Sequence, residues 1–298
     1  MKINTKTLSD RFMEIDPTIR GKSMVKKSND MIDNSVSTFK AEKSSVTGSK
    51  KLANCKELRD VNNIKQQIYK YIISNSLQLG KFRVISPARF IKIKQDLDKM
   101  LDELRLKMDE FVFQWPEIVK QDMVRLGRLY NSSDYPSQEE LRNSFGAAIV
   151  FRPLPDFNKF NVTGLDSNDS NELMKTLNDS LQEDVNGLVG DLLNKLIYGN
   201  DPERNEKTGN GLLYSITRLA TEDSFKQNTL DNVKKIAEAV KDLNALDVTE
   251  INEFADNLIR IFNVDADSIR NSKSARLDVV TDARAELEKI TSAMAGFC

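Results

Sequence analysis

Residues that could carry catalysis are scarce in this 298-residue chain, because it contains no histidine. A Ser-His-Asp triad, a Cys-His dyad and a His-ligated zinc or haem site are therefore excluded. The two cysteines, Cys55 and Cys298, are too few and too far apart to predict a Cys₄ metal site or a disulfide framework. The lysines and arginine around Cys55 would lower the pKa of its thiol, but without a histidine to act as base we interpret it as an incidental thiol.

Loops that bind phosphate or metal ions are not predicted either. The glycine-bearing loop 199–211 lacks the G-x-x-x-x-G-K-[ST] order of a phosphate loop. The acidic clusters that begin at Asp166 and Asp265 lack the glycine and the bidentate glutamate of a calcium loop, so we interpret them as helix N-caps. The sequence therefore predicts no cofactor and no metal site. An enzyme that uses carboxylate-bound Mg²⁺ is the third-ranked alternative.

The charge of the chain is distributed unevenly. Residues 1–100 contain 21 Lys and Arg against 10 Asp and Glu, whereas residues 101–298 contain 23 against 35. A basic first third can bind nucleic acid or an acidic protein surface, and it can equally pair with the acidic remainder of its own chain or of a second copy.

The stretch 80–94 interleaves cations with aromatic and aliphatic residues. Such a surface can bind phosphates while Phe82 stacks on a base. The alternative is an ordinary loop between helices with Lys and Arg at its edges. Together with two lysines further upstream, the candidate residues for binding nucleic acid or an acidic partner are Lys50, Lys51, Lys81, Phe82, Arg83, Arg89, Lys92 and Lys94.

The elements that would position these residues are mainly helical. Apolar residues at spacings of three and four predict one helix from about 57, ended near Gly80, and a second that begins at Ser86-Pro87. The second has nearly heptad spacing through Phe111, so the two should pack as a long antiparallel hairpin over about 57–113. Trp115-Pro116 is predicted to break this helix and to open a third one running to about 131. Ser137 and Glu140 predict a short capped helix.

The rest of the chain divides into an arm, a small β element and a helical bundle. Residues 1–51 are predicted to be a basic N-terminal arm or linker, because 21–51 is polar and contains few apolar residues. Residues 52–165 should hold the hairpin with a small β element near 147–163, and 166–298 a C-terminal bundle. The first helix of the bundle follows a cap region at 167–172 and has its apolar series from Leu173 to Leu196; further helices are expected at about 212–220, 223–245, 248–263 and 266–295. The predicted fold class is mainly α.

No segment contains the roughly 18–20 uninterrupted apolar residues of a membrane span, and Met1–Lys6 is not followed by the apolar core of a secretory signal. The sparse cysteines fit a reducing compartment. We therefore expect no membrane partner and a location in the cytoplasm of a host cell, or in a virion.

The segment 128–160 carries a combination of residues that resembles a known family. The combination is Tyr130-Asn131, Asp134-Tyr135-Pro136, Glu140-Leu141, Phe145 and Phe151-Arg152-Pro153-Leu154-Pro155-Asp156. It resembles phage and mobile-element proteins that share a domain of unknown function, the family numbered 3150, over about residues 60–165. The resemblance implies a phage or mobile-element origin and a helical hairpin before this turn, and it supplies no active site.

These observations predict a non-enzymatic accessory protein that acts by binding nucleic acid or an acidic protein through its basic N-terminal third. The alternative is a structural or assembly protein of a virion that forms homo-oligomers through its helices. Salt-dependent binding of nucleic acid would distinguish the first from concentration-dependent self-association.

Overall fold

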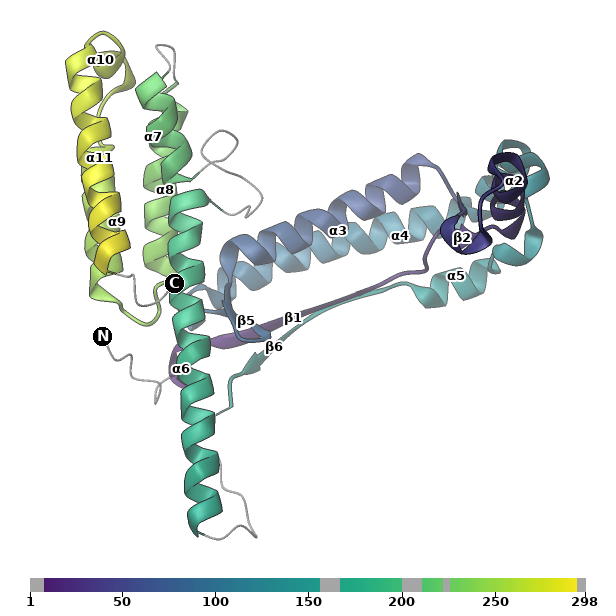
Figure 1. The fold of residues 1–298 in the computed structure, drawn as a ribbon, viewed down its shortest axis with the longest axis horizontal. Helices are drawn as coiled ribbons and strands as arrows, with labels where there is room; N and C mark the ends of the chain where they lie inside the picture. Colours follow the sequence, from purple (N-terminus) through teal and green to yellow (C-terminus); the bar gives the residue numbers. More distant parts are fainter. Residues whose placement is uncertain (1–7, 156–166, 200–210, 222–225, 294–298) are drawn as a thin grey trace. The chain divides into compact units, whose positions relative to one another are not determined.

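The computed structural model describes residues 8–155, 167–199, 211–221 and 226–293 (Figure 1). The fold is mainly helical with small antiparallel sheets, as the sequence predicts. The chain forms two compact units. The first unit comprises Met1–Asp16, Ile72–Ile91 and Phe151–Cys298, and the second comprises Pro17–Tyr71 and Lys92–Val150. These bounds differ from the three consecutive regions that the sequence predicts, because each unit is assembled from separate stretches of the chain.

The long antiparallel hairpin is confirmed. Helix α3 (Lys56–Asn75) and helix α4 (Phe90–Leu126) run side by side in Figure 1, and a short 3₁₀ turn, η3 (Pro87–Arg89), precedes α4. The Tyr71 hydroxyl donates a hydrogen bond of 2.6 Å to Asp96 across the pair. The predicted apolar series of α4 begins at Phe90, which is half-buried, and its other members are buried, because the apolar stripe of one helix must be covered by its neighbours; they are Ile93, Leu97, Leu101, Leu104, Met108 and Phe111.

The predicted break at Trp115-Pro116 is wrong, because α4 continues through Pro116 to Leu126. A proline inside a helix has no N–H to donate to the carbonyl four residues earlier, here that of Val112. The side-chain amide of Gln138 donates to that carbonyl at 2.8 Å. A neighbouring side chain thus supplies the hydrogen bond that proline removes.

Residues 21–51 are folded, which corrects the prediction of an arm or linker. Strands β2 (Val25–Lys27) and β3 (Ser49–Lys51) pair antiparallel, and helix α2 (Asn29–Phe39) and the 3₁₀ turn η2 (Lys43–Ser45) connect them. The Ser28 hydroxyl accepts from the N–H of Met31 and caps α2. Although the segment is polar, its few apolar residues are enough to anchor it, because Met24, Ile32 and Leu52 are buried.

The corner that follows α4 is built around aromatic residues. Two 3₁₀ turns, η4 (Gly127–Leu129) and η5 (Ser132–Asp134), lead to helix α5 (Gln138–Ser144), whose capping box of Ser137 and Glu140 is formed as predicted. The indole N–H of buried Trp115 donates to the Pro136 carbonyl at 2.9 Å, and its ring contacts that of Tyr135.

The first unit contains most of a four-stranded sheet in the order β4-β5-β1-β6. Its strands are β1 (Met13–Arg20), which follows helix α1 (Leu8–Arg11), the hairpin β4 (Leu77–Leu79) and β5 (Phe82–Ile85), and β6 (Gly146–Pro153). Strand β6 confirms the first half of the predicted β element, and its second half, 157–162, lies outside the described residues. The other three strands were not predicted.

Gly80 forms the turn of the β4–β5 hairpin instead of ending the preceding helix. Its φ is +54°, and a Cβ there would lie 2.7 Å from the carboxylate of Asp184. Both conditions favour glycine, which alone reaches this conformation without a steric penalty. Helix α3 already ends at Asn75.

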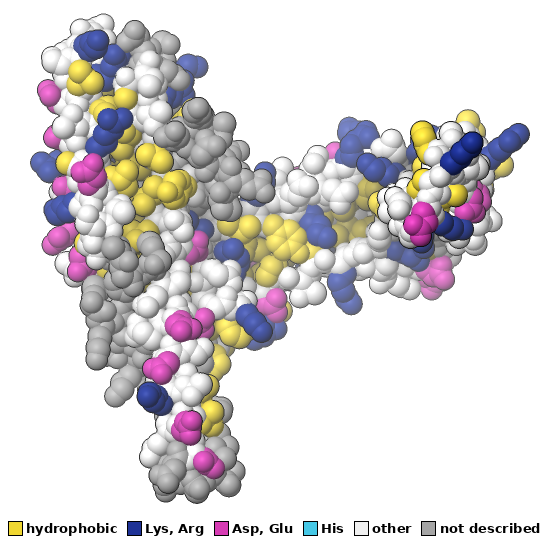
Figure 2. Space-filling model, viewed as in Figure 1, with side chains coloured by type: hydrophobic (Ala, Val, Ile, Leu, Met, Phe, Trp, Pro, Cys, Tyr) yellow, Lys and Arg dark blue, Asp and Glu magenta, His cyan; other side chains and the backbone are white. Residues whose placement is uncertain are grey.

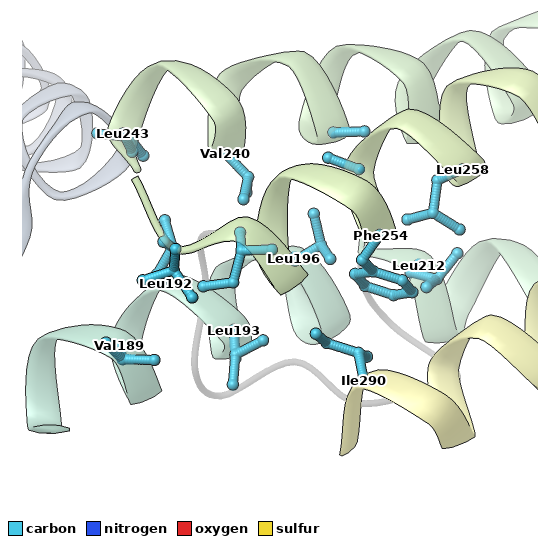
Figure 3. Close-up of a cluster of buried hydrophobic side chains, with 14 of the residues drawn as sticks. Val189, Leu192, Leu193, Leu196, Leu212, Val240, Leu243, Phe254, Leu258 and Ile290 are labelled. Atoms are coloured by element: carbon cyan, nitrogen blue, oxygen red, sulfur yellow. The ribbon is translucent and has the colours of Figure 1, made fainter. Parts of the chain in front are cut away.

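The C-terminal bundle is confirmed. It consists of α6 (Ser167–Tyr198), α7 (Leu212–Thr221), α8 (Gln227–Leu243), α9 (Thr249–Ile261), α10 (Ala266–Arg270) and α11 (Lys273–Ala293). Figure 3 shows leucines of α6 facing Val240, Phe254 and Ile290 in its buried core. The predicted helix 266–295 is divided, because the Ser272 hydroxyl accepts from the N–H of Ala275 and starts a new helix. None of the helices in the described ranges is long and apolar enough to cross a bilayer.

Substitutions of Gln138 and Pro116 test whether the Gln138 side chain replaces the backbone hydrogen bond that Pro116 cannot make. Replacing Gln138 with alanine should lower the free energy of unfolding by about 1 kcal/mol, because the Val112 carbonyl loses its donor. In a Pro116→Ala background, where the backbone N–H is restored, the same replacement should change stability by less than about 0.5 kcal/mol. Urea unfolding of the four proteins measures both effects, and equal losses in the two backgrounds would contradict the assignment.

Candidate anion-binding cleft

A cleft of about 350 Å³ lies in the second unit, between the segment before β2, the end of β3 and the first turns of α3. Its charged lining side chains are Lys22, Lys51 and Arg59, and all three are exposed to solvent. The polar side chains of Ser23, Asn54 and Asn62 complete its rim. Met24, Leu52 and Leu58 supply apolar surface. The cleft therefore combines cations, amides and an apolar wall within one small volume.

One buried carboxylate fixes the wall of this cleft. Asp122 on α4 accepts hydrogen bonds from the backbone N–H of Ala53 at 2.7 Å and from the Tyr135 hydroxyl at 2.9 Å. Arg125 donates to the same carboxylate at 2.8 and 2.5 Å, and also to the Lys51 carbonyl at 2.7 Å. Ala53 has a φ of +52°, which is strained for a residue with a side chain. The Asp122 network holds the chain in this conformation.

Lys50, which the sequence predicted as a binding residue, points away from the cleft. Its ammonium lies 2.6 Å from the carboxylate of Asp134 and donates to the Leu129 carbonyl, and its side chain is only 8% exposed. Strand side chains alternate between faces, so Lys51 points to solvent on the opposite face. Lys50 therefore anchors β3 to the corner after α4 and is not available for an external phosphate.

The remaining predicted residues divide between the two units. Lys81, Phe82, Arg83 and Arg89 belong to the first unit, and Lys92 and Lys94 to the second. Phe82 is 46% exposed. Three of the cations have partners in their own chain: Arg83 donates to Ser76, Arg89 to Asn75, and Lys94 to Asp98. Of the eight predicted residues, Lys51 alone lines the cleft.

The sequence reasoning missed Lys22, Arg59 and the amides of the rim, because they are separated along the chain by folded segments that were expected to be a linker. Lys22 precedes β2, and Arg59 lies in the first turn of α3. The signal available was the high density of basic residues, with 12 Lys and Arg against 5 Asp and Glu between 17 and 71. That count locates the region and does not identify which side chains converge.

Cys55 also lines the cleft, and the prediction about its pKa is wrong. Burial raises the pKa of the thiol above its ordinary value, and the neighbouring carboxylate of Glu57 raises it further, although backbone N–H groups oppose this effect. Desolvation, which disfavours the charged thiolate, is the largest cause of the raised pKa. The structure gives Cys55 no activation as a nucleophile.

The first unit contains a smaller polar cleft of about 320 Å³, lined among others by Arg83, Asp191 and Lys195. The Lys195 ammonium is buried and donates to the Ile73 carbonyl at 2.8 Å, while Asp191 accepts from the N–H of Gln78 at 3.0 Å. These two side chains dock α6 onto the end of α3 and onto β4, so their contacts are explained by packing. Among the described residues, no three or more Cys, Asp and Glu side chains are placed to hold a metal ion.

Comparison of the chain with protein-family models, with curated proteins and with solved structures returns no match. The resemblance to the family numbered 3150 therefore stays a prediction.

The Asp122 network should be essential for the stability of the second unit. Asp122→Asn removes the negative charge and one acceptor while the Arg125 guanidinium stays in place, and should lower the free energy of unfolding by about 2–3 kcal/mol. Asp109→Asn, on the exposed face of the same helix, should change stability by less than about 0.5 kcal/mol. Urea unfolding compares the two, and equal effects would contradict the assigned role.

The Cys55 thiol should react slowly at neutral pH. In a Cys298→Ser variant, its alkylation rate should rise with pH around a midpoint above 9.0, the ordinary value of the thiol pKa, because only the thiolate reacts. Adding Glu57→Gln should move this midpoint to lower pH. A midpoint below 9.0 in the first variant would show that the cations dominate instead.

Proposed function

We propose that this protein is a non-enzymatic accessory protein that binds single-stranded nucleic acid, with the cationic cleft of the second unit as a phosphate-binding site. The observation that carries the proposal is the lining of the cleft: its charged side chains are Lys22, Lys51 and Arg59, and no carboxylate lines it. In Figure 2, Lys and Arg side chains are visible over the end of the second unit that carries α2 and β2. Phosphate contacts of this kind supply most sequence-independent affinity.

The chemistry of the cleft favours a single strand. The three cations can bind successive phosphates or one phosphate from several sides. The amides of Asn54 and Asn62 can donate to and accept from base edges, and Leu58 offers apolar surface against which a base can pack. Such base edges are accessible in an unpaired strand, whereas a duplex presents them only in its grooves. The cleft volume of about 350 Å³ is in the range of sites for small ligands, which suits one or two nucleotides.

Two acidic side chains lie close to the cleft without lining it. Glu57 is near the Cys55 thiol, and Glu140 is close enough to Lys22 for that lysine to contribute to lowering the glutamate pKa. The main cause of that lowered pKa is the N–H and hydroxyl of Ser137, which already occupy the Glu140 carboxylate. The three cations that line the cleft outnumber these two carboxylates, which favours a positive potential toward solvent.

An acidic protein segment is the other ligand that the sequence favours, and it would be attracted by the same charges. The apolar wall and the amides of Asn54 and Asn62 favour a nucleotide, because a planar base can pack on apolar surface and form hydrogen bonds with amides. Processes that require an accessory protein for single strands, such as replication or recombination of a phage or mobile element, are the proposed setting.

A triple variant tests the site. Lys22→Gln, Lys51→Gln and Arg59→Gln together should weaken binding of a mixed-sequence single-stranded oligonucleotide. They should also reduce the slope of log affinity against log salt concentration by about 2, since each phosphate contact contributes roughly 0.7 for single strands. Fluorescence anisotropy over a series of salt concentrations measures both quantities.

The matched control removes three lysines from elsewhere in the same unit, namely Lys65, Lys70 and Lys99. Changed to glutamine, they give the same net charge and should leave most of the affinity and slope intact. Equal weakening in both triple variants would show that binding depends on overall charge and not on the cleft. Competition with a poly-glutamate peptide that displaces the oligonucleotide at equal concentration would favour an acidic protein partner.

A further inference from the structure

Helix α4 carries exposed apolar side chains on the face opposite its buried stripe. Leu106 is 57% exposed, Phe113 is 74% and Val124 is 86%. Phe113 and Val124 follow Leu106 by seven and by eighteen residues, which is close to two and to five full turns, so the three lie on one face. Large apolar side chains aligned in this way over five turns are unusual on a surface exposed only to water.

The charged residues between them complete a seam with coiled-coil spacing. Glu110, Glu117 and Lys120 are exposed and lie on the same face. The six positions 106, 110, 113, 117, 120 and 124 are separated by four, three, four, three and four residues, which is the alternation that keeps a seam facing a second helix. We name these six residues the α4 seam.

We propose that the α4 seam binds the α4 seam of a second copy of this chain in antiparallel orientation. In the proposed register, the residue numbers of each facing pair add to 230. Leu106 therefore faces Val124 of the second copy, and Glu110 faces Lys120 of the second copy. Phe113 then faces the aliphatic part of Glu117 of the second copy. We call each pair of facing residues a layer. Because a two-fold axis relates the two copies, each layer occurs twice, and both Glu110 and Lys120 of each copy face an opposite charge, whereas Glu117 faces Phe113.

This self-complementarity is the reason to choose a second copy over another protein. In a parallel pair, Glu110 would face Glu110 and Lys120 would face Lys120, and like charges in contact are unfavourable. In the antiparallel register, Glu110 faces Lys120 in both layers, and Leu106 contacts Val124 of the second copy at each end of the seam. The two Phe113 rings would lie about 6 Å apart along the helix axis, at the centre of the seam.

Neighbouring charges do not oppose this register. Glu110 pairs with Lys107 and Glu117 with Lys120 in the same helix, and exposed pairs of this type are weak enough to be exchanged. Arg105 would approach Arg125 of the second copy, but each guanidinium is directed to its own chain. Arg105 bonds Asp102 and the Ala147 carbonyl, and Arg125 bonds Asp122 and the Lys51 carbonyl.

Sedimentation equilibrium of the full chain over a range of concentrations tests the proposal. The wild-type protein should dimerise, and Phe113→Glu should be monomeric at the same concentrations, because it places four carboxylates at the centre. Phe39→Glu, at a 77% exposed position on α2, is the matched control and should dimerise like the wild type. A monomeric wild type, or dimerisation that Phe113→Glu leaves unchanged, would overturn the proposal.

A charge exchange tests the antiparallel register itself. Glu110→Lys and Lys120→Glu should each weaken the dimer roughly tenfold or more, because each creates two like-charge layers. The double variant should recover the wild-type dissociation constant. In a parallel dimer these layers contain like charges in every variant, so single variants that dimerise as tightly as the wild type would overturn the antiparallel register, and so would a double variant that stays as weak as the single ones. Because these positions are exposed, all variants should retain the wild-type circular dichroism spectrum.

Discussion

The second unit depends on the buried carboxylate of Asp122. A single carboxylate on α4 binds the backbone of Ala53, the hydroxyl of Tyr135 and the guanidinium of Arg125, and thereby connects α4 to the segment after β3 and to the corner after α4. Removing a charge from water is costly unless hydrogen bonds replace the lost solvation, and here four of them do. The strained backbone at Ala53 is held by the same contacts, so the position of the cleft wall and the stability of the corner have one cause.

This arrangement explains how a polar, lysine-rich segment becomes an ordered surface. Lys50 is directed inward to Asp134, and Lys51 outward to the cleft, because neighbouring strand residues point to opposite faces. The inward lysine fixes the strand, and the outward one is left exposed to solvent. If the α4 seams associate as proposed, a dimer would present two such clefts and bind a strand more tightly than either cleft alone.

Much of the fold could be predicted from the sequence, and the failures share a physical origin. Periodic apolar residues predicted α3, α4, α6, α8 and α9, because the spacing that places apolar residues on one face of a helix can be seen within a single segment of the sequence. The predicted break at Pro116 was wrong because the compensating donor, Gln138, is supplied by a different element. The predicted linker over 21–51 was wrong because β2 and β3 are short and pair over a distance of more than twenty residues. The cleft was only partly predictable: charge density indicated the region, but convergence of Lys22, Lys51 and Arg59 follows from that pairing.

The cleft of the second unit is proposed to bind a single strand. Hydrogen–deuterium exchange of the wild-type protein with and without a mixed-sequence single-stranded oligonucleotide tests it most directly, because it locates the contact without altering the chain. The account predicts added protection at residues 22–25 and 51–62, decreasing as salt is raised. Protection confined to other segments, or none at concentrations that saturate binding, would contradict it.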